Sequence, residues 1–151
     1  MELHDLSRQQ TRVVNVITLH SLKVVAGESL GQKGIIETNI PICYLHATLQ
    51  SKASFDHALS ATANAFVYII GGVGAAGVGL ESFGEGSLVL FKKDGDSIHI
   101  DNPSERPLDF LLVAGEPIGE PVLRAGPFVM NTKQEILQAF KDYQNGLMGT
   151  I

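Results

Sequence analysis

The stretch NAFVYIIGGVGAAGVGL, residues 64–80, decides the fold because its residues are compatible with three different structures: a membrane segment, a dinucleotide-binding loop and a hairpin between two strands. It ends a run from Ala58 to Leu80 that contains no charged residue and is long enough to span a bilayer. However, glycines crowd the second half of the run, Asn64 and several hydroxyl side chains interrupt the first half, and no basic residues flank it. We therefore do not expect a membrane segment here.

The second candidate structure is a dinucleotide-binding loop. Gly72, Gly74 and Gly77 form a G-x-G-x-x-G pattern directly after the strand-like segment AFVYII. That motif requires a helix next, whose N-terminus binds the pyrophosphate. Here the glycine-rich VGLESFGEG follows, and then the apolar segment SLVLF. This pattern favours the third structure, a glycine-rich hairpin between two strands of a sheet.

Outward from this stretch, most of the chain reads as short strands. In DSIHID, Ile98 and Ile100 point one way, whereas Ser97, His99 and Asp101 point the other. Many such segments, bounded by Gly, Pro, Asn or Asp, predict a small mostly β sandwich or barrel. The other candidate strands are RVVNVITL, LKVVAG, PICYLHATL, NAFVYIIG, SLVLF and PLDFLLVAG.

One amphipathic helix is predicted after these strands, over residues 132–145. Thr132 and Glu135 have the spacing of a capping box, and Gly146 is a typical helix stop. An apolar stripe runs along one face of this helix, and we name it the helix stripe: Ile136, Leu137, Phe140 and Tyr143. Residues 1–11 are predicted to be a flexible arm, and residues 12–151 a single domain.

Composition restricts the classes of function. The chain of 151 residues has a formal net charge of −5 and no dense Lys/Arg cluster, which argues against a nucleic-acid partner. Cys43 is the single cysteine, so no internal disulfide can form, and a reducing compartment is the natural setting. The start, MELHDLSRQQ, lacks the apolar core of a signal peptide. We expect a cytoplasmic protein without membrane attachment.

Four segments carry a resemblance to a known family. They are AGEPIGEPV at 114–122, GPFVMNTKQEI at 126–136, NAFVYIIGG at 64–72 and VVAGESLG at 24–31. Together they resemble the C-terminal half of the pirins, two-domain members of the cupin superfamily. The resemblance implies a single cupin-type jelly-roll β-barrel with a C-terminal α-helix, which agrees with the strands and the helix predicted from the residues.

The resemblance also implies what this chain lacks. In pirins the N-terminal half carries a metal site of three histidines and one glutamate, which is linked to iron binding and, in some members, to quercetin dioxygenase activity. None of the positions that match here belongs to that motif. We therefore predict no cofactor and no catalytic residue, and we interpret the chain as a binding or assembly module.

The alternative is a cupin enzyme, of dioxygenase or isomerase type, with a transition metal such as iron in a non-standard histidine site. Its candidate ligands are His46, His57 and His99, provided that the polar face of 41–49 lines the barrel interior. His57 stands without the second histidine of a His-x-His pair, and no Glu precedes the glycines. Cys43 alternates with apolar residues and is predicted to be a small buried hydrophobe rather than a thiolate.

The helix stripe requires a covering surface. In a two-barrel pirin the neighbouring barrel is available for this role. In this chain the helix stripe either folds back on its own barrel or docks on another copy, and we predict a homodimer with two-fold, self-complementary contacts. A separate N-terminal cupin or another protein is the alternative partner.

Overall fold

The computed structural model describes residues 3–6, 19–77 and 79–149. The chain divides into two compact units, Met1–Pro117 and Ile118–Ile151, and each is described by itself. The sequence led us to expect one domain over 12–151, and that expectation stays a prediction.

The first unit contains a large sheet and a small sheet. The large sheet has the strand order β1-β10-β7-β12-β5-β2, with β1 parallel to β10 and the other neighbours antiparallel. The bounds of its strands are β1 Leu3–Leu6, β2 Leu19–Ala26, β5 Ile42–Leu49, β7 Asn64–Gly71, β10 Leu88–Phe91 and β12 Leu108–Gly115.

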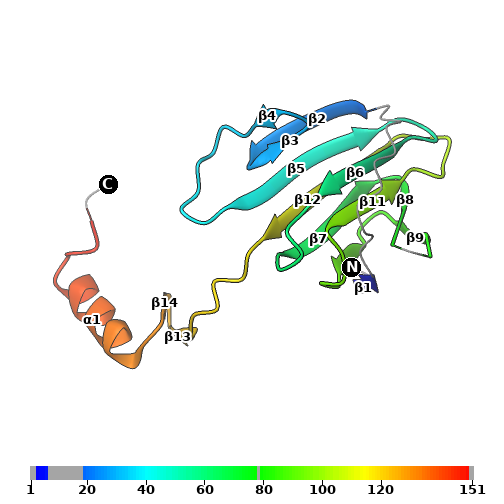
Figure 1. Cartoon of the computed structure of the whole chain (residues 1–151). Coiled ribbons are helices and arrows are strands. Elements are labelled where there is room, and N and C mark those ends of the chain that lie inside the picture. Colours follow the sequence, from blue (N-terminus) through cyan, green and yellow to red (C-terminus); the bar gives the residue numbers. More distant parts are fainter. Residues whose placement is uncertain (1–2, 7–18, 78, 150–151) are drawn as a thin grey trace. The chain divides into compact units, whose positions relative to one another are not determined.

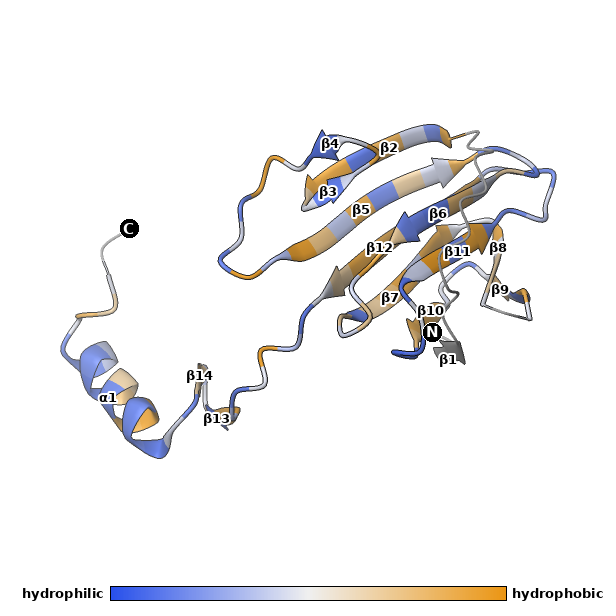
Figure 2. Ribbon diagram, viewed as in Figure 1, coloured by the Kyte–Doolittle hydropathy of each residue, from blue (hydrophilic) through white to orange (hydrophobic). Residues whose placement is uncertain are grey.

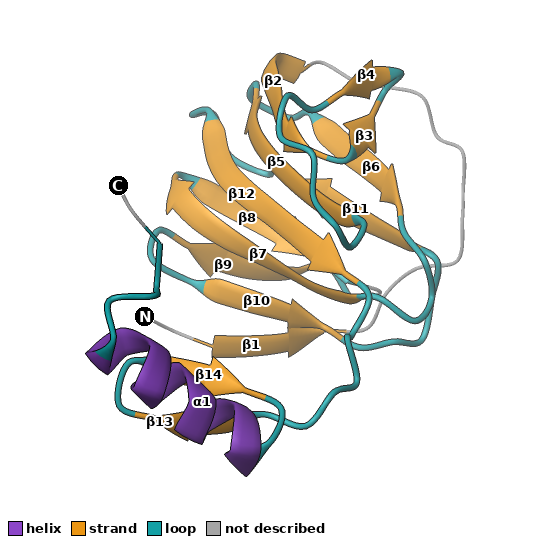
Figure 3. Cartoon of the chain, turned by 90° about the vertical axis from the view of Figure 1, so that its left-hand side faces the viewer, coloured by secondary structure: helices purple, strands orange, loops and turns teal. Residues whose placement is uncertain are grey.

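The small sheet is antiparallel, with the order β6-β11-β8-β9, and it faces the large sheet (Figures 1 and 3). A short hairpin of β3 and β4 follows β2. The bounds are β3 Glu28–Ser29, β4 Gln32–Lys33, β6 Ser54–Ala58, β8 Val73–Ala76, β9 Glu81–Gly84 and β11 Ser97–Asp101. The expectation of a mostly β, jelly-roll fold is confirmed.

The expected flexible arm includes a strand. Residues 3–6 form β1, which pairs with Leu88–Phe91 at the edge of the large sheet. Residues 1–2 and 7–11 of that arm lie outside the described residues, so its boundary stays a prediction.

The core lies between the inner faces of the two sheets. Burial alternates strictly along β12, and Figure 2 shows hydrophobic positions separated by more hydrophilic ones along β5. Phe55 of the small sheet and Phe110 of the large sheet are fully buried, with ring centroids 6.0 Å apart. Burying one such side chain contributes about 2–3 kcal/mol, so both sheets depend on this contact.

Gly72 is the corner at which the chain leaves the large sheet, after β7, and enters the small sheet as β8. Its φ is +91°, and a Cβ atom there would lie 2.5 Å from the carbonyl oxygen of Pro107. Strand β8 continues through Gly74 and pairs with β9 in a hairpin whose turn includes Gly77 and Leu80. Because a strand follows the glycines, this segment is not a dinucleotide-binding loop.

Asn102 connects two loops at the end of the small sheet. Its side chain is 1% exposed. The amide nitrogen donates to the carbonyl oxygens of Gln50 and Arg106, each at 2.8 Å, and the amide oxygen accepts from the backbone N–H of Ser104 at 3.0 Å. Since a buried amide is costly without partners, Asn102 holds these loops in place.

The second unit is a hairpin with one helix. Strands β13 (Leu123–Ala125) and β14 (Phe128–Met130) pair with each other, and α1 (Lys133–Gln144) lies on them (Figure 3). Ile136 and Ala139 of the helix are buried with Phe128 in a small core. None of the helices that the structure describes has the length and apolar character to cross a membrane.

The predicted capping box is confirmed. The backbone N–H of Glu135 donates to the Thr132 hydroxyl at 3.2 Å, and the Glu135 carboxylate accepts from the backbone N–H of Thr132 at 2.8 Å. The helix ends with Asn145 as the C-cap, followed by Gly146 at a φ of +70°. The expected bounds of 132–145 therefore correspond to the helix with its two capping residues.

We expect Gly72→Ala to lower the free energy of unfolding of the first unit by about 2 kcal/mol or more, because it adds a strained φ and a backbone clash. Gly71→Ala is the matched control, since a Cβ atom there has no neighbour within 4 Å and its φ is not in the left-handed region. Denaturant unfolding of both variants measures the difference, and equal stabilities would contradict this role for Gly72.

We expect Thr132→Ala to destabilise α1 by about 1 kcal/mol, because the first-turn N–H groups lose an acceptor. Hydrogen exchange of the α1 amides measures the change. Gln134→Ala is the control, since it alters an exposed residue of the same turn and leaves the capping box in place. Unchanged protection in Thr132→Ala would show that the hairpin alone holds the helix.

Candidate functional site

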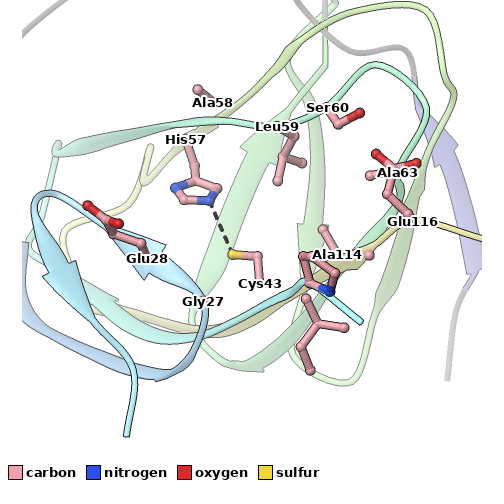
Figure 4. Close-up of a pocket in the computed structure, with 13 residues that line it drawn as sticks. Gly27, Glu28, Cys43, His57, Ala58, Leu59, Ser60, Ala63, Ala114 and Glu116 are labelled. Carbon is pink, nitrogen blue, oxygen red and sulfur yellow. Dashed lines mark hydrogen bonds between the residues drawn. The ribbon is translucent and has the colours of Figure 1, made fainter. Parts of the chain in front are cut away.

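A cavity of about 280 Å³ opens at one end of the two sheets (Figure 4). It is formed where β5 begins, where β6 ends and where β12 ends, and we name this end the barrel mouth: Ile42, Cys43, His57, Leu59, Ala114 and Glu116. The Cys43 and His57 side chains point toward each other in the barrel mouth, with Glu28 on one side and Glu116 on the other (Figure 4).

Strand alternation places the two reactive side chains of the barrel mouth. Cys43 shares the inner face of β5 with Leu45 and Ala47, which are fully buried. His57 shares the inner face of β6 with Phe55, on which its ring stacks at a centroid distance of 6.0 Å and an interplanar angle of 9°. The two sheets thus bring a thiol and an imidazole together.

The imidazole of His57 has a partner at each nitrogen. Nε2 lies 3.1 Å from Sγ of Cys43, and Nδ1 lies 3.1 Å from Oγ of Ser29. In a neutral imidazole one nitrogen donates and the other accepts. The ring is therefore hydrogen-bonded on both sides by groups of the chain itself.

Burial keeps this pair uncharged. It raises the pKa of the Cys43 thiol to about 11, and it lowers the pKa of His57 below its ordinary value. At neutral pH Cys43 is a thiol, in agreement with the prediction that it is no thiolate. It is only partly buried, however, because its side chain lines the cavity.

The structure does not bring His46, His57 and His99 together. His46 lies on the outer face of β5, where its Nε2 is 2.8 Å from the Asp109 carboxylate. His99 lies on the outer face of β11, with ring nitrogens 2.7 Å from Asp56 and 3.0 Å from Asp101. Only His57, of the three, faces the interior.

Period-two alternation is the physical reason for this separation. Leu45 and Ala47 flank His46 and point into the core, and Ile98 and Ile100 flank His99 in the same way. The polar face of β5 therefore does not line the barrel interior, which was the condition for a three-histidine site. Within the described ranges, no group of three or more His, Cys, Asp or Glu side chains is placed to hold a metal ion.

The barrel mouth consequently does not fit a cupin metal site of three histidines and one glutamate, of the kind that the resemblance assigns to the other half of pirins. That site needs three imidazoles and a carboxylate that converge, whereas one imidazole and one thiol meet here at hydrogen-bonding distance. Sequence reasoning missed this pair, since the two residues are 14 positions apart and on different sheets. One feature of the sequence could have indicated the pair: Cys43 and His57 both occupy inward-facing positions near the ends of their strands.

The helix stripe divides into a buried part and an exposed part. Ile136 is 4% exposed and belongs to the core of its own unit. Leu137, Phe140 and Tyr143 are 54%, 36% and 66% exposed, and the rings of Phe140 and Tyr143 contact Phe128 edge-on. The candidate interface therefore reduces to Leu137, Phe140 and Tyr143.

We expect the folded chain to lose stability as pH falls below about 6.5, the ordinary pKa of histidine. In that range the unfolded chain takes up a proton at His57 more readily than the folded chain, because burial lowers the pKa of His57 in the folded chain. Urea unfolding at pH 7 and pH 5 should show a smaller loss in His57→Gln than in the wild type. The exposed His20→Gln is the control, and an equal loss in all three proteins would contradict the assignment.

The chain matches the family model of the pirin C-terminal cupin domain over residues 44–149. A pirin-like protein from Solanum lycopersicum is 42% identical over 129 residues, which cover 85% of this chain and 44% of the relative. Pirin-1 from Arabidopsis thaliana is 42% identical over 147 residues, 96% of this chain and 49% of the relative. The chain thus spans about half the length of these curated relatives.

Among solved structures, a quercetin 2,3-dioxygenase from Acinetobacter baumannii superposes with a TM-score of 0.73 and 27% identity. The superposition covers 86% of this chain and 44% of the dioxygenase chain. The chain belongs to the pirin family and contains its C-terminal cupin domain.

Proposed function

We propose that this cupin domain acts in the cytoplasm as a binding and assembly module rather than as a catalyst. The observation that carries the proposal is the chemistry of the barrel mouth. Cys43 and His57 are hydrogen-bonded to each other and are held uncharged by burial. A protonated thiol that shares a hydrogen bond with a neutral imidazole can line a binding cavity, and the raised pKa of the thiol disfavours the thiolate that nucleophilic chemistry needs.

The assembly role is supported by the exposed part of the helix stripe. Leu137, Phe140 and Tyr143 form an apolar face on a helix that is capped and anchored by its own hairpin. Such a face gains free energy when another apolar surface covers it. A two-fold axis can place this face against the same face of a second copy, so the proposed occupant is a second copy of this chain.

The alternative function is metal-dependent dioxygenase or isomerase chemistry. Its support is the similarity to the A. baumannii quercetin 2,3-dioxygenase, whose chain is about twice as long as the matched part. Two observations oppose this alternative. The barrel mouth contains one imidazole and one thiol, and the other two candidate histidines, His46 and His99, lie on the outer faces of their sheets. The residues present do not fit the family's metal centre.

The proposal predicts a metal-poor dimer. Elemental analysis of untagged protein, in line with light scattering, should give far less than one transition metal per chain and twice the 16.2 kDa chain mass. One bound transition metal per chain would overturn the binding-module reading. A metal-poor monomer would contradict the predicted dimer, and a separate cupin would then be the partner to test.

We expect the double variant Leu137→Ser, Tyr143→Ser to raise the dimer dissociation constant about 10- to 100-fold, because both truncations remove apolar area from the proposed contact. Gln134→Ser, Gln144→Ser is the matched control on the same helix, at exposed polar positions. Sedimentation equilibrium measures both constants. If the two variants dimerise equally, the interface lies elsewhere.

A further inference from the structure

We infer that the cavity of the barrel mouth is a binding site for a small, uncharged, mainly apolar molecule with one hydrogen-bonding group, of the size of a single-ring aromatic amide or alcohol. This inference deepens the proposed binding role and rests on it, but it does not depend on the dimer.

The size and lining of the cavity support such a ligand. Its volume of about 280 Å³ lies just below the usual range for drug-sized molecules, so it suits a smaller one. Ile42, Leu59 and Ala114 give it apolar walls, and the thiol of Cys43 lies beside the imidazole of His57. Apolar walls around a few convergent polar groups are typical of small-molecule sites.

The polar groups of the cavity select against charge. Because burial keeps Cys43 protonated and His57 unprotonated at neutral pH, they offer no opposite charge to an ionic ligand. An ion placed beside these two neutral groups would lose hydration that they only partly replace. A neutral amide or hydroxyl can exchange hydrogen bonds with the thiol and the imidazole at much lower cost.

The rim of the cavity opposes anions in particular. Glu28 and Glu116 lie on two sides of the opening (Figure 4), and the Glu116 carboxylate accepts a hydrogen bond from Thr62 at 2.8 Å. These carboxylates, in a chain of net charge −5, repel an anionic ligand before it enters. The same carboxylates attract a cation to the rim, whereas the groups beside the ring position, Cys43 and His57, are neutral.

A second hollow gives room for a substituent on the ligand. It has a volume of about 400 Å³ and shares Gly27, Glu28, Pro41 and Ile42 with the cavity of the barrel mouth. Ile36 lies on its lining and is 51% exposed. A ligand with its ring beside His57 can therefore extend along this hollow.

The test uses Cys43, the single cysteine of the chain, as an internal reporter of occupancy. Three probes share one ring and differ in charge: benzamide is neutral, benzoate is anionic and benzylamine is cationic at neutral pH. Alkylation of Cys43 by iodoacetamide at mildly alkaline pH is followed by intact mass, and the ring signals of His57 are followed by NMR. Protection should scale with occupancy. At a benzamide concentration of ten times its Kd, Cys43 should be alkylated about tenfold more slowly than in the free protein.

Two variants fill the cavity, and one is a matched control. Glu116→Trp adds bulk at the rim of the cavity, and Leu59→Trp adds it at a half-buried position of the lining. Leu90→Trp makes the same change as the second variant on β10, outside the lining. We expect both cavity variants to abolish protection by benzamide and the shift of the His57 signals, whereas Leu90→Trp preserves both effects.

Some outcomes would overturn the inference. Benzamide that neither protects Cys43 nor shifts His57 would show that the cavity does not bind this class of ligand. Equal protection by benzoate would show that charge is not selected, and protection that persists in both cavity variants would place binding elsewhere. Metal content, measured separately, decides the proposed function, so a metal-poor protein that ignores all three probes would reject this site alone.

Discussion

Each of the two sheets in the first unit has an apolar inner face, and this inner face is not stable in water unless the other sheet covers it. Phe55 from one sheet and Phe110 from the other meet in the resulting core. The side-chain period of a strand is two, so this single constraint also directs every other residue of β5, β6 and β11 to the inside or the outside. The position of each histidine follows from it.

The same constraint explains the chemistry of the barrel mouth. The inward positions at the start of β5 and the end of β6 are Cys43 and His57, and the apolar surroundings that bury them also keep them neutral. His46 and His99 occupy outward positions, where carboxylates are their partners. The interior therefore presents two neutral polar groups at the barrel mouth, and the three candidate histidines, all among the described residues, do not converge.

Local signals were sufficient for much of the fold. The alternation in DSIHID predicted which side of β11 is buried, and the Thr132–Glu135 pair predicted where α1 begins. Less could be predicted for glycines and termini. The role of Gly72 as a corner between sheets depends on the backbone of Pro107, and the pairing of Leu3–Leu6 depends on β10, neither of which is near in sequence.

The sequence by itself determined the mostly β fold class, the amphipathic terminal helix and the family, because strand alternation, capping and contiguous motifs are local properties of the chain. Only the tertiary structure decided which polar residues meet. Cys43 and His57 come from different sheets, and their pairing depends on strand order and register. These are set by the packing of the whole core, and no spacing in the sequence encodes them.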